Sequence, residues 1–205
     1  MLYPFLAVIF DAFTLVVNKR LFVKFKHLDY KAYALWLFVW IIVLGLLLSP
    51  WLVTIQPAAA QPYYLWLLLA MAFLAANHNL LYYYSLKYEK VCEIEPFLLF
   101  NPLVTIIIAS LFYVDERSWH VYVAAIIASL ALMWSHLDHR HFKLGKPLLA
   151  ILGFALLHGL EVVVIKQLLN VYSPLALYLV RSIVTALFLL VLAKGRVPKI
   201  AWRQI

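Results

Sequence analysis

Charged residues, cysteine and glycine are all scarce in this chain of 205 residues. Only 13% of the residues are charged while 67% are hydrophobic, a balance that one soluble core cannot bury, so a soluble enzyme is excluded. The single cysteine, Cys92, excludes an internal disulfide and a cysteine-based zinc cluster. A glycine-rich phosphate loop, a nucleophile elbow and a zinc-protease signature are also missing from the sequence. We therefore expect no catalytic residue and no cofactor.

The sequence has instead seven long apolar runs. Each is close to the roughly 20 residues that cross a bilayer as a helix. Strands of a barrel would be about half as long and would alternate in polarity, whereas these runs are apolar on all sides. We predict an all-α integral membrane protein of seven transmembrane helices, the first one retained because it lacks a signal-peptide cleavage site. The runs cover approximately residues 2–23, 32–55, 63–84, 94–114, 119–137, 147–169 and 174–193.

The net charge of +8 would suggest a nucleic-acid partner in a soluble protein, but here the basic residues mark topology. If every run spans the membrane, fourteen of the 17 lysine and arginine residues lie on one side and only Arg117 lies on the other. The positive-inside rule makes the basic side cytoplasmic, with Met1 outside and Ile205 inside. We expect the lipid bilayer as a partner, a multi-pass location in the inner or plasma membrane, and no nucleic acid. The fourteen are Lys19, Arg20, Lys24, Lys26, Lys31, Lys87, Lys90, Arg140, Lys143, Lys146, Lys194, Arg196, Lys199 and Arg203.

Two segments of the chain resemble each other, FLAVIFDAFTLVVNKRLF near the start and LLAILGFALLHGLEVVVIKQLL near residue 150. Because five runs precede the second copy, an odd number, that copy enters the membrane inverted relative to the first. Inverted repeats with a site near the midplane are typical of secondary transporters. We divide the chain into a first five-helix repeat, 1–145, and the first two helices of an incomplete second repeat, 146–205. The aligned pairs include Lys19 with Lys166, Asp11 with His158 and Thr14 with Glu161.

Three short motifs lie between about Asn79 and Trp134. They are a helix end of the A-L-x-Y type, a proline-bearing fourth helix, and a turn reading Asp115-Glu116-Arg117. In these features the chain resembles the drug/metabolite transporter superfamily, in particular its EamA-like members, whose turn has Gly where this chain has Asp. The sixth and seventh runs resemble the start of the family's second repeat, through Lys166, the Ser173-Pro174 turn and Arg181.

The resemblance implies ten helices in two inverted five-helix repeats and the movement of small organic solutes or metabolites, mostly outward. It also implies termini that are usually cytoplasmic. The chain departs from this pattern in two ways. Its seven runs lack three helices of the second repeat, so it looks C-terminally truncated, and its charge bias places Met1 outside. We keep the orientation that the charges indicate.

Ionisable side chains near the middle of the runs are the first candidates for a site. Such a group costs about 2.5–3.5 kcal/mol to insert, so it normally faces a bundle interior or a wet cavity. Asp11 and His158 are equivalent positions that an inverted axis would bring together, with Thr14 and Glu161 one turn beyond them. We expect these four residues to line the translocation cavity, where a carboxylate or the imidazole exchanges a proton. The alternative is that Asp11 and His158 form a buried polar pair that only fixes helix packing.

Polar residues interrupt the third and fourth runs as well. Residues 77–79 span some 200° of a helix, so one of them contacts a neighbouring helix while another faces the cavity. We count Asn77 and His78 among the cavity residues. Asn101 joins them because it precedes Pro102, whose ring removes a backbone donor and suits a gate hinge.

Arg181 lies about two turns inside the seventh run. Its guanidinium could bind an anionic group of the solute, or form a bridge to Glu161 or Asp11. Residues 135–141 offer four metal-ligating side chains, but Arg140 within this segment would repel a cation. We interpret 135–141 as a solvated loop and expect no metal site.

The sequence favours a secondary transporter, an exporter of small organic solutes by alternating access, with the proton as one candidate coupling ion. Its buried charges match amino acids, amines or other zwitterions. One alternative is a seven-helix photoreceptor or receptor, against which the seventh run lacks a lysine for a retinal Schiff base. Another is an intramembrane enzyme or assembly factor with a metal-binding loop at 135–141. Small residues in 124–131 suit packing within the monomer or a homodimer.

Overall fold

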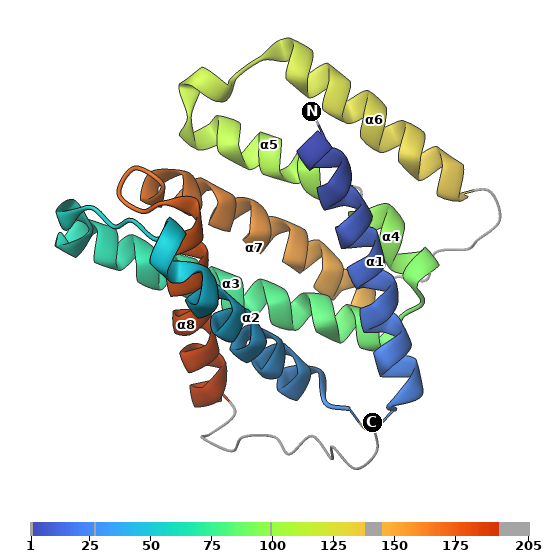
Figure 1. The fold of residues 1–205 in the computed structure, drawn as a ribbon. Helices are drawn as coiled ribbons and strands as arrows, with labels where there is room; N and C mark the ends of the chain where they lie inside the picture. The colour runs from blue at the N-terminus through green and yellow to red at the C-terminus, as the bar shows by residue number, and fades with distance from the viewer. Residues whose placement is uncertain (1, 27, 99, 138–144, 193–205) are drawn as a thin grey trace.

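The computed structural model describes residues 2–26, 28–98, 100–137 and 145–192, which form an all-helical bundle (Figure 1). The predicted all-α fold class is confirmed for these residues, and each predicted run is occupied by helix. Two short 3₁₀ turns, Pro57–Ala60 and Val114–Glu116, lie in the connections. The helices are α1 Leu2–Lys24, α2 Tyr30–Leu52, α3 Pro62–Tyr88, α4 Val91–Leu98, α5 Asn101–Phe112, α6 Trp119–Leu137, α7 Lys146–Leu168 and α8 Pro174–Leu192.

The fourth predicted helix differs from expectation, because the structure divides it into α4 and α5. Phe100 precedes α5, and Pro102 lies in the first turn of that helix. Proline is favoured there because its missing N–H has no helical acceptor in a first turn, whereas inside a continuous helix it would remove a hydrogen bond. The sequence predicted a hinge at Pro102 within one helix, and the structure has the start of a new helix there.

Five helices or helix pairs among the described residues are long and apolar enough to cross a membrane: Tyr30–Pro50, Pro62–Tyr88, Val91–Phe112, Lys146–Leu168 and Pro174–Leu192. Shorter than these, Trp119–Ala131 is also an apolar helix. Many large apolar side chains point away from the protein, and Trp134, Trp119 and Val191 are each at least 75% exposed. Soluble proteins rarely display apolar surface on this scale. The bundle is therefore compatible with a lipid environment.

Helix α7 lies at the centre of the bundle, with α3 along one side and α5 along another (Figure 1). Helix α8 packs against α2 and α3, α6 packs against α5, and α1 packs against α3. Small residues allow the close contacts. Ala75 and Ala76 of α3 are fully buried, and a Cβ added at Gly159 of α7 would lie 2.8 Å from Ile108 Cδ1 and 3.4 Å from Thr105 Cα of α5.

One end of the bundle joins the α2–α3 connection to the α7–α8 connection. The Ser173 N–H donates to the Thr54 carbonyl oxygen at 2.9 Å, and the chain makes an isolated antiparallel bridge between Ile55 and Tyr172. Below this pairing Leu168 is fully buried in one of the two apolar core clusters. The two connections therefore lie on the same side of the bundle.

The other end collects the last turns of α1 and α3 and the start of α7. Lys19 Nζ donates to the Leu86 carbonyl oxygen at 2.7 Å, close to the end of α3, where cations stabilise the exposed carbonyls. Ser85 Oγ donates to the Pro147 carbonyl oxygen at 2.6 Å, which ties α3 to α7. Among the described residues, the basic α1–α2 and α3–α4 connections meet at this end, where Lys87 Nζ donates to the Leu28 carbonyl oxygen at 2.8 Å.

Candidate functional site

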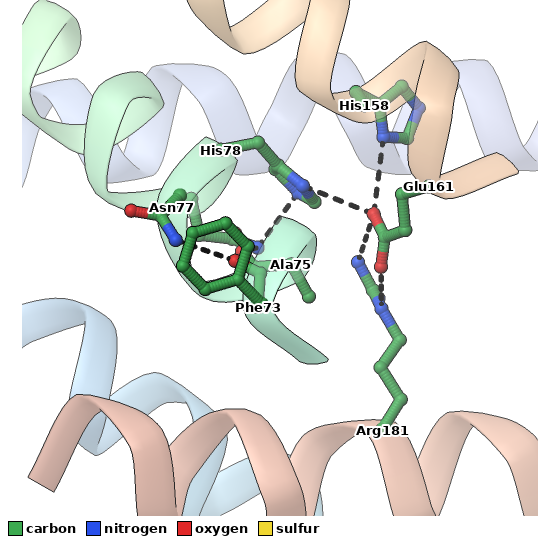
Figure 2. Close-up of polar contacts among 8 residues, drawn as sticks. Phe73, Ala75, Asn77, His78, His158, Glu161 and Arg181 are labelled. Carbon is green, nitrogen blue, oxygen red and sulfur yellow. Dashed lines mark hydrogen bonds and ion pairs between the residues drawn. The ribbon is translucent and has the colours of Figure 1, made fainter. Parts of the chain in front are cut away.

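Four ionisable side chains from three helices meet inside the bundle (Figure 2). His78 comes from α3, His158 and Glu161 come from α7, and Arg181 comes from α8. The three-residue spacing of His158 and Glu161 places them on one face of α7. We call these four residues the polar cluster. It is enclosed by apolar helices, so each group must find its electrostatic partner within the protein.

Glu161 is the centre of the polar cluster, and its side chain is completely buried. Arg181 holds it with two parallel contacts, Nε to Oε1 at 2.5 Å and Nη2 to Oε2 at 3.0 Å. This fork matches the planar guanidinium to the planar carboxylate. The arginine therefore neutralises a charge that would be very costly to bury alone.

The two histidines approach the same carboxylate oxygen from different helices. The distance to Glu161 Oε2 is 3.1 Å from His78 Nδ1 and 3.7 Å from His158 Nδ1, and within the described structure neither nitrogen has a hydrogen-bond partner of normal geometry. The His158 ring stacks on Phe154, with centroids 5.6 Å apart. The side chain of His78 is 5% exposed and that of His158 is 32% exposed. His158 is therefore the most accessible member of the polar cluster.

Asn79 adds a contact on the far side of the His78 ring. Its Nδ2 donates to the Ala75 carbonyl oxygen at 2.8 Å and lies 2.9 Å from His78 Nε2. Sequence reasoning did not select Asn79 as a site residue. The signals for it were its place beside His78 and its four-residue spacing from Ala75, which allows an amide to reach the helix backbone.

Two of the predicted cavity residues lie apart from the polar cluster. Asp11 and Thr14 are exposed on α1, and α1 packs against α3 rather than along the face of α7 that carries His158. Asp11 interacts electrostatically with Tyr82, whose ring lies 5.4 Å from that of Phe154. The expected approach of Asp11 to His158 is thus replaced, in the described residues, by the approach of Glu161.

Asn77 and Asn101, the other predicted cavity residues, also lie outside the polar cluster. Asn77 is next to His78 but points away from it, and its Nδ2 donates to the Phe73 carbonyl oxygen at 2.7 Å (Figure 2). Asn101 lies in the first turn of α5, where its Oδ1 is buried with no hydrogen-bond partner in the described part of the chain. Of the three polar residues 77–79, therefore, only His78 reaches Glu161.

Three residues of the polar cluster are of the types that bind metal ions. The ligand atoms of His78, His158 and Glu161 lie within 4.8 Å of one another. Two contacts oppose such an ion. Arg181 already places a positive charge on both carboxylate oxygens, and the outer nitrogen of His78 faces an amide nitrogen instead of the carbonyl or carboxylate that orients a metal-bound imidazole. The residues fit a buried ion pair with two neighbouring imidazoles better than a metal centre.

The histidine-rich segment cannot be placed beside this cluster. Residues 138–144 lie outside the described residues, as do the side chains of 135–137.

The chain matches no family model, no curated protein and no solved structure among those with which it was compared. The arguments for a function therefore come from the geometry of the polar cluster and from the sequence pattern.

Proposed function

We propose that this chain acts as a secondary transporter of small organic solutes or metabolites, an exporter working by alternating access around a midplane cavity. The observation that carries the proposal is the polar cluster, a completely buried glutamate held by an arginine and approached by two histidines from three apolar helices. Ionisable groups in such helices mark solute or proton pathways. Membership of the EamA-like drug/metabolite transporters is part of this proposal.

The polar cluster holds more ionisable groups than helix packing requires. Apolar residues of similar volume often stabilise a buried site as well as an ion pair does, or better. A pair that served packing alone would need only Glu161 and Arg181, yet His78 and His158 also approach Oε2 of the carboxylate. Such competing partners for one carboxylate suit a site whose contacts exchange during a transport cycle.

The proposed architecture has seven spans, five in a first repeat and two in an inverted second repeat. Two features support it. The described connections separate into two ends of the bundle, as alternating spans require, and the basic α1–α2 and α3–α4 connections share one end. Helices α2 and α8, the second helices of the two proposed repeats, pack together so closely that a Cβ added at Gly45 would lie 2.9 Å from Leu179 Cδ1. Equivalent helices meet in this way near an in-plane axis.

The test is uptake into liposomes that contain the purified chain and a pH-sensitive dye. Three radiolabelled probes represent the charge classes: a mixture of L-amino acids, putrescine as an amine, and glycine betaine as a zwitterion whose quaternary ammonium carries no proton. We expect saturable uptake of at least one probe under a pH gradient, and at least a tenfold loss in Glu161→Gln.

The matched control is Arg20→Gln, which removes a charge from the exposed surface of α1 and should transport like the unmodified chain. Uptake equal to that of protein-free liposomes for all three probes would contradict the proposal. Equal uptake by Glu161→Gln and the unmodified chain would instead remove the polar cluster from the transport path.

A further inference from the structure

The two histidines of the polar cluster differ in what lies behind them, and from this difference we infer separate roles. We propose that Asn79 holds His78 as a neutral imidazole with its proton on Nδ1, and that His158 is the imidazole of the polar cluster that takes up and releases a proton. The role of His158 in coupling rests on the proposed function. The state of His78 rests on geometry alone.

The orientation of the Asn79 amide follows from its neighbours. With the amide nitrogen 2.8 Å from the Ala75 carbonyl oxygen, the NH₂ group donates to that oxygen; the reversed amide would place two acceptor oxygens against each other. The second hydrogen of the same NH₂ is available for His78 Nε2, 2.9 Å away. A nitrogen facing a donor must accept, so Nε2 carries no proton and Nδ1 carries it.

This arrangement resists further protonation of His78. A doubly protonated imidazole would direct an Nε2–H group at the NH₂ of Asn79, two donors face to face with no acceptor between them. The ring is also almost fully buried, where an added charge loses its hydration. Its Nδ1 lies 3.1 Å from Glu161 Oε2, the charged group that this nitrogen approaches. His78 therefore orients the carboxylate and keeps one charge state.

Among the described residues His158 has no such partner. Its side chain is about a third exposed, against 5% for His78, and its Nδ1 lies 3.7 Å from Glu161 Oε2 without a hydrogen bond to any described group. An added proton gives an Nδ1–H that can donate to this oxygen and a positive charge that Glu161 stabilises. Imidazole is the side chain that ordinarily changes charge between pH 5 and 8.

The charged groups near the two imidazoles belong to different helices of the bundle. Glu161 is on α7, Arg181 is on α8, and each histidine faces the other across 5.2 Å between ring centroids. The range 101–112 of α5 contains no ionisable residue, and the α4 carboxylate Glu93 interacts with Glu89 at the end of α3. Protonation of His158 thus adds a second cation beside one carboxylate. Competition with Arg181 for Glu161 then frees the guanidinium to bind an anionic group of a solute.

The experiment is ¹⁵N NMR of histidine-labelled protein in lipid nanodiscs between pH 5 and 9. His78→Gln and His158→Gln each remove one set of signals and so assign the two rings. We expect the His78 signals to report a protonated Nδ1 and a bare Nε2 from pH 5 to 8, while the His158 signals shift toward the doubly protonated form as the pH falls. A His78 ring that titrates, or that carries its proton on Nε2, would overturn the inference.

A pair of asparagine variants keeps the test decisive if His78→Gln fails to fold. Asn79→Asp replaces the donor that faces His78 Nε2 with an acceptor. The His78 imidazole should then gain an Nε2 proton and begin to titrate. Asn77→Asp is the matched control, because the Asn77 amide donates to the Phe73 carbonyl oxygen, whereas the Asn79 amide faces His78 Nε2. Unchanged histidine signals in Asn79→Asp would contradict the role of Asn79.

The coupling role is measured separately, as proton flux in the dye-loaded liposomes. His158→Gln should abolish solute-driven proton movement, while Asn77→Asp should retain it. A proton flux that survives in His158→Gln would refute the coupling role. The NMR measurement needs no solute. It therefore tests the protonation states of the two histidines even if the transport proposal fails.

Discussion

Arg181 of α8 donates to both carboxylate oxygens of Glu161 of α7, at 2.5 and 3.0 Å, and the glutamate side chain is completely buried. The pair is therefore the main polar link between these two helices in the described structure. A link of this kind costs more to break on one side than to remove altogether, because a single substitution leaves a buried charge without its partner.

A double-mutant cycle measures this asymmetry. We expect Arg181→Met and Glu161→Leu each to lower the free energy of unfolding by about 3–5 kcal/mol, and the double variant to lose much less than the sum. The measurement is SDS-induced unfolding in mixed micelles, followed by tryptophan fluorescence. Arg20→Met, on the exposed surface of α1, should stay within about 0.5 kcal/mol of the unmodified chain. Additive single effects would show that the two groups do not depend on each other.

Helices α5 and α7 are so close at Gly159 that any side chain there would force a neighbouring side chain to move. An added Cβ would lie 2.8 Å from Ile108 Cδ1, so we expect Gly159→Ala to lower thermal stability, although alanine favours a helix by about 1 kcal/mol over glycine. Ile108→Val removes the clashing methyl group and should restore the loss. If Gly159→Ala has the same effect with and without the Ile108→Val substitution, the strain lies elsewhere.

Cysteine labelling tests the orientation that the charges indicate. Cys92 is exposed at the start of α4, on the basic end, and should react with a membrane-impermeant maleimide only in inside-out vesicles. In a Cys92→Ala background, Gln56→Cys and Asp115→Cys should react in intact cells, because both residues are exposed in connections at the opposite end. Labelling of all three positions from one side would contradict seven alternating spans, and the reversed pattern would contradict the charge-based orientation.

The sequence predicted all four members of the polar cluster as site residues, but it also predicted four residues that lie outside the cluster. His78, His158, Glu161 and Arg181 were each selected because an ionisable group inside an apolar run needs a partner. Asp11, Thr14, Asn77 and Asn101 were selected on similar grounds and lie outside the cluster. Sequence spacing shows which residues share a face of one helix, as His158 and Glu161 do, but the partner of that face depends on how neighbouring helices pack.

The sequence by itself determined that the chain is helical, where most of its helices lie, and which connections carry the positive charge. The physical reason is local: a run of about 20 apolar residues in lipid must satisfy its backbone hydrogen bonds internally. Only the tertiary structure decided that Glu161 meets Arg181 and both histidines, and that Asn79 faces His78 Nε2. Those contacts depend on the rotation of each helix about its axis, which is set by how closely neighbouring helices pack at small residues such as Ala75 and Gly159.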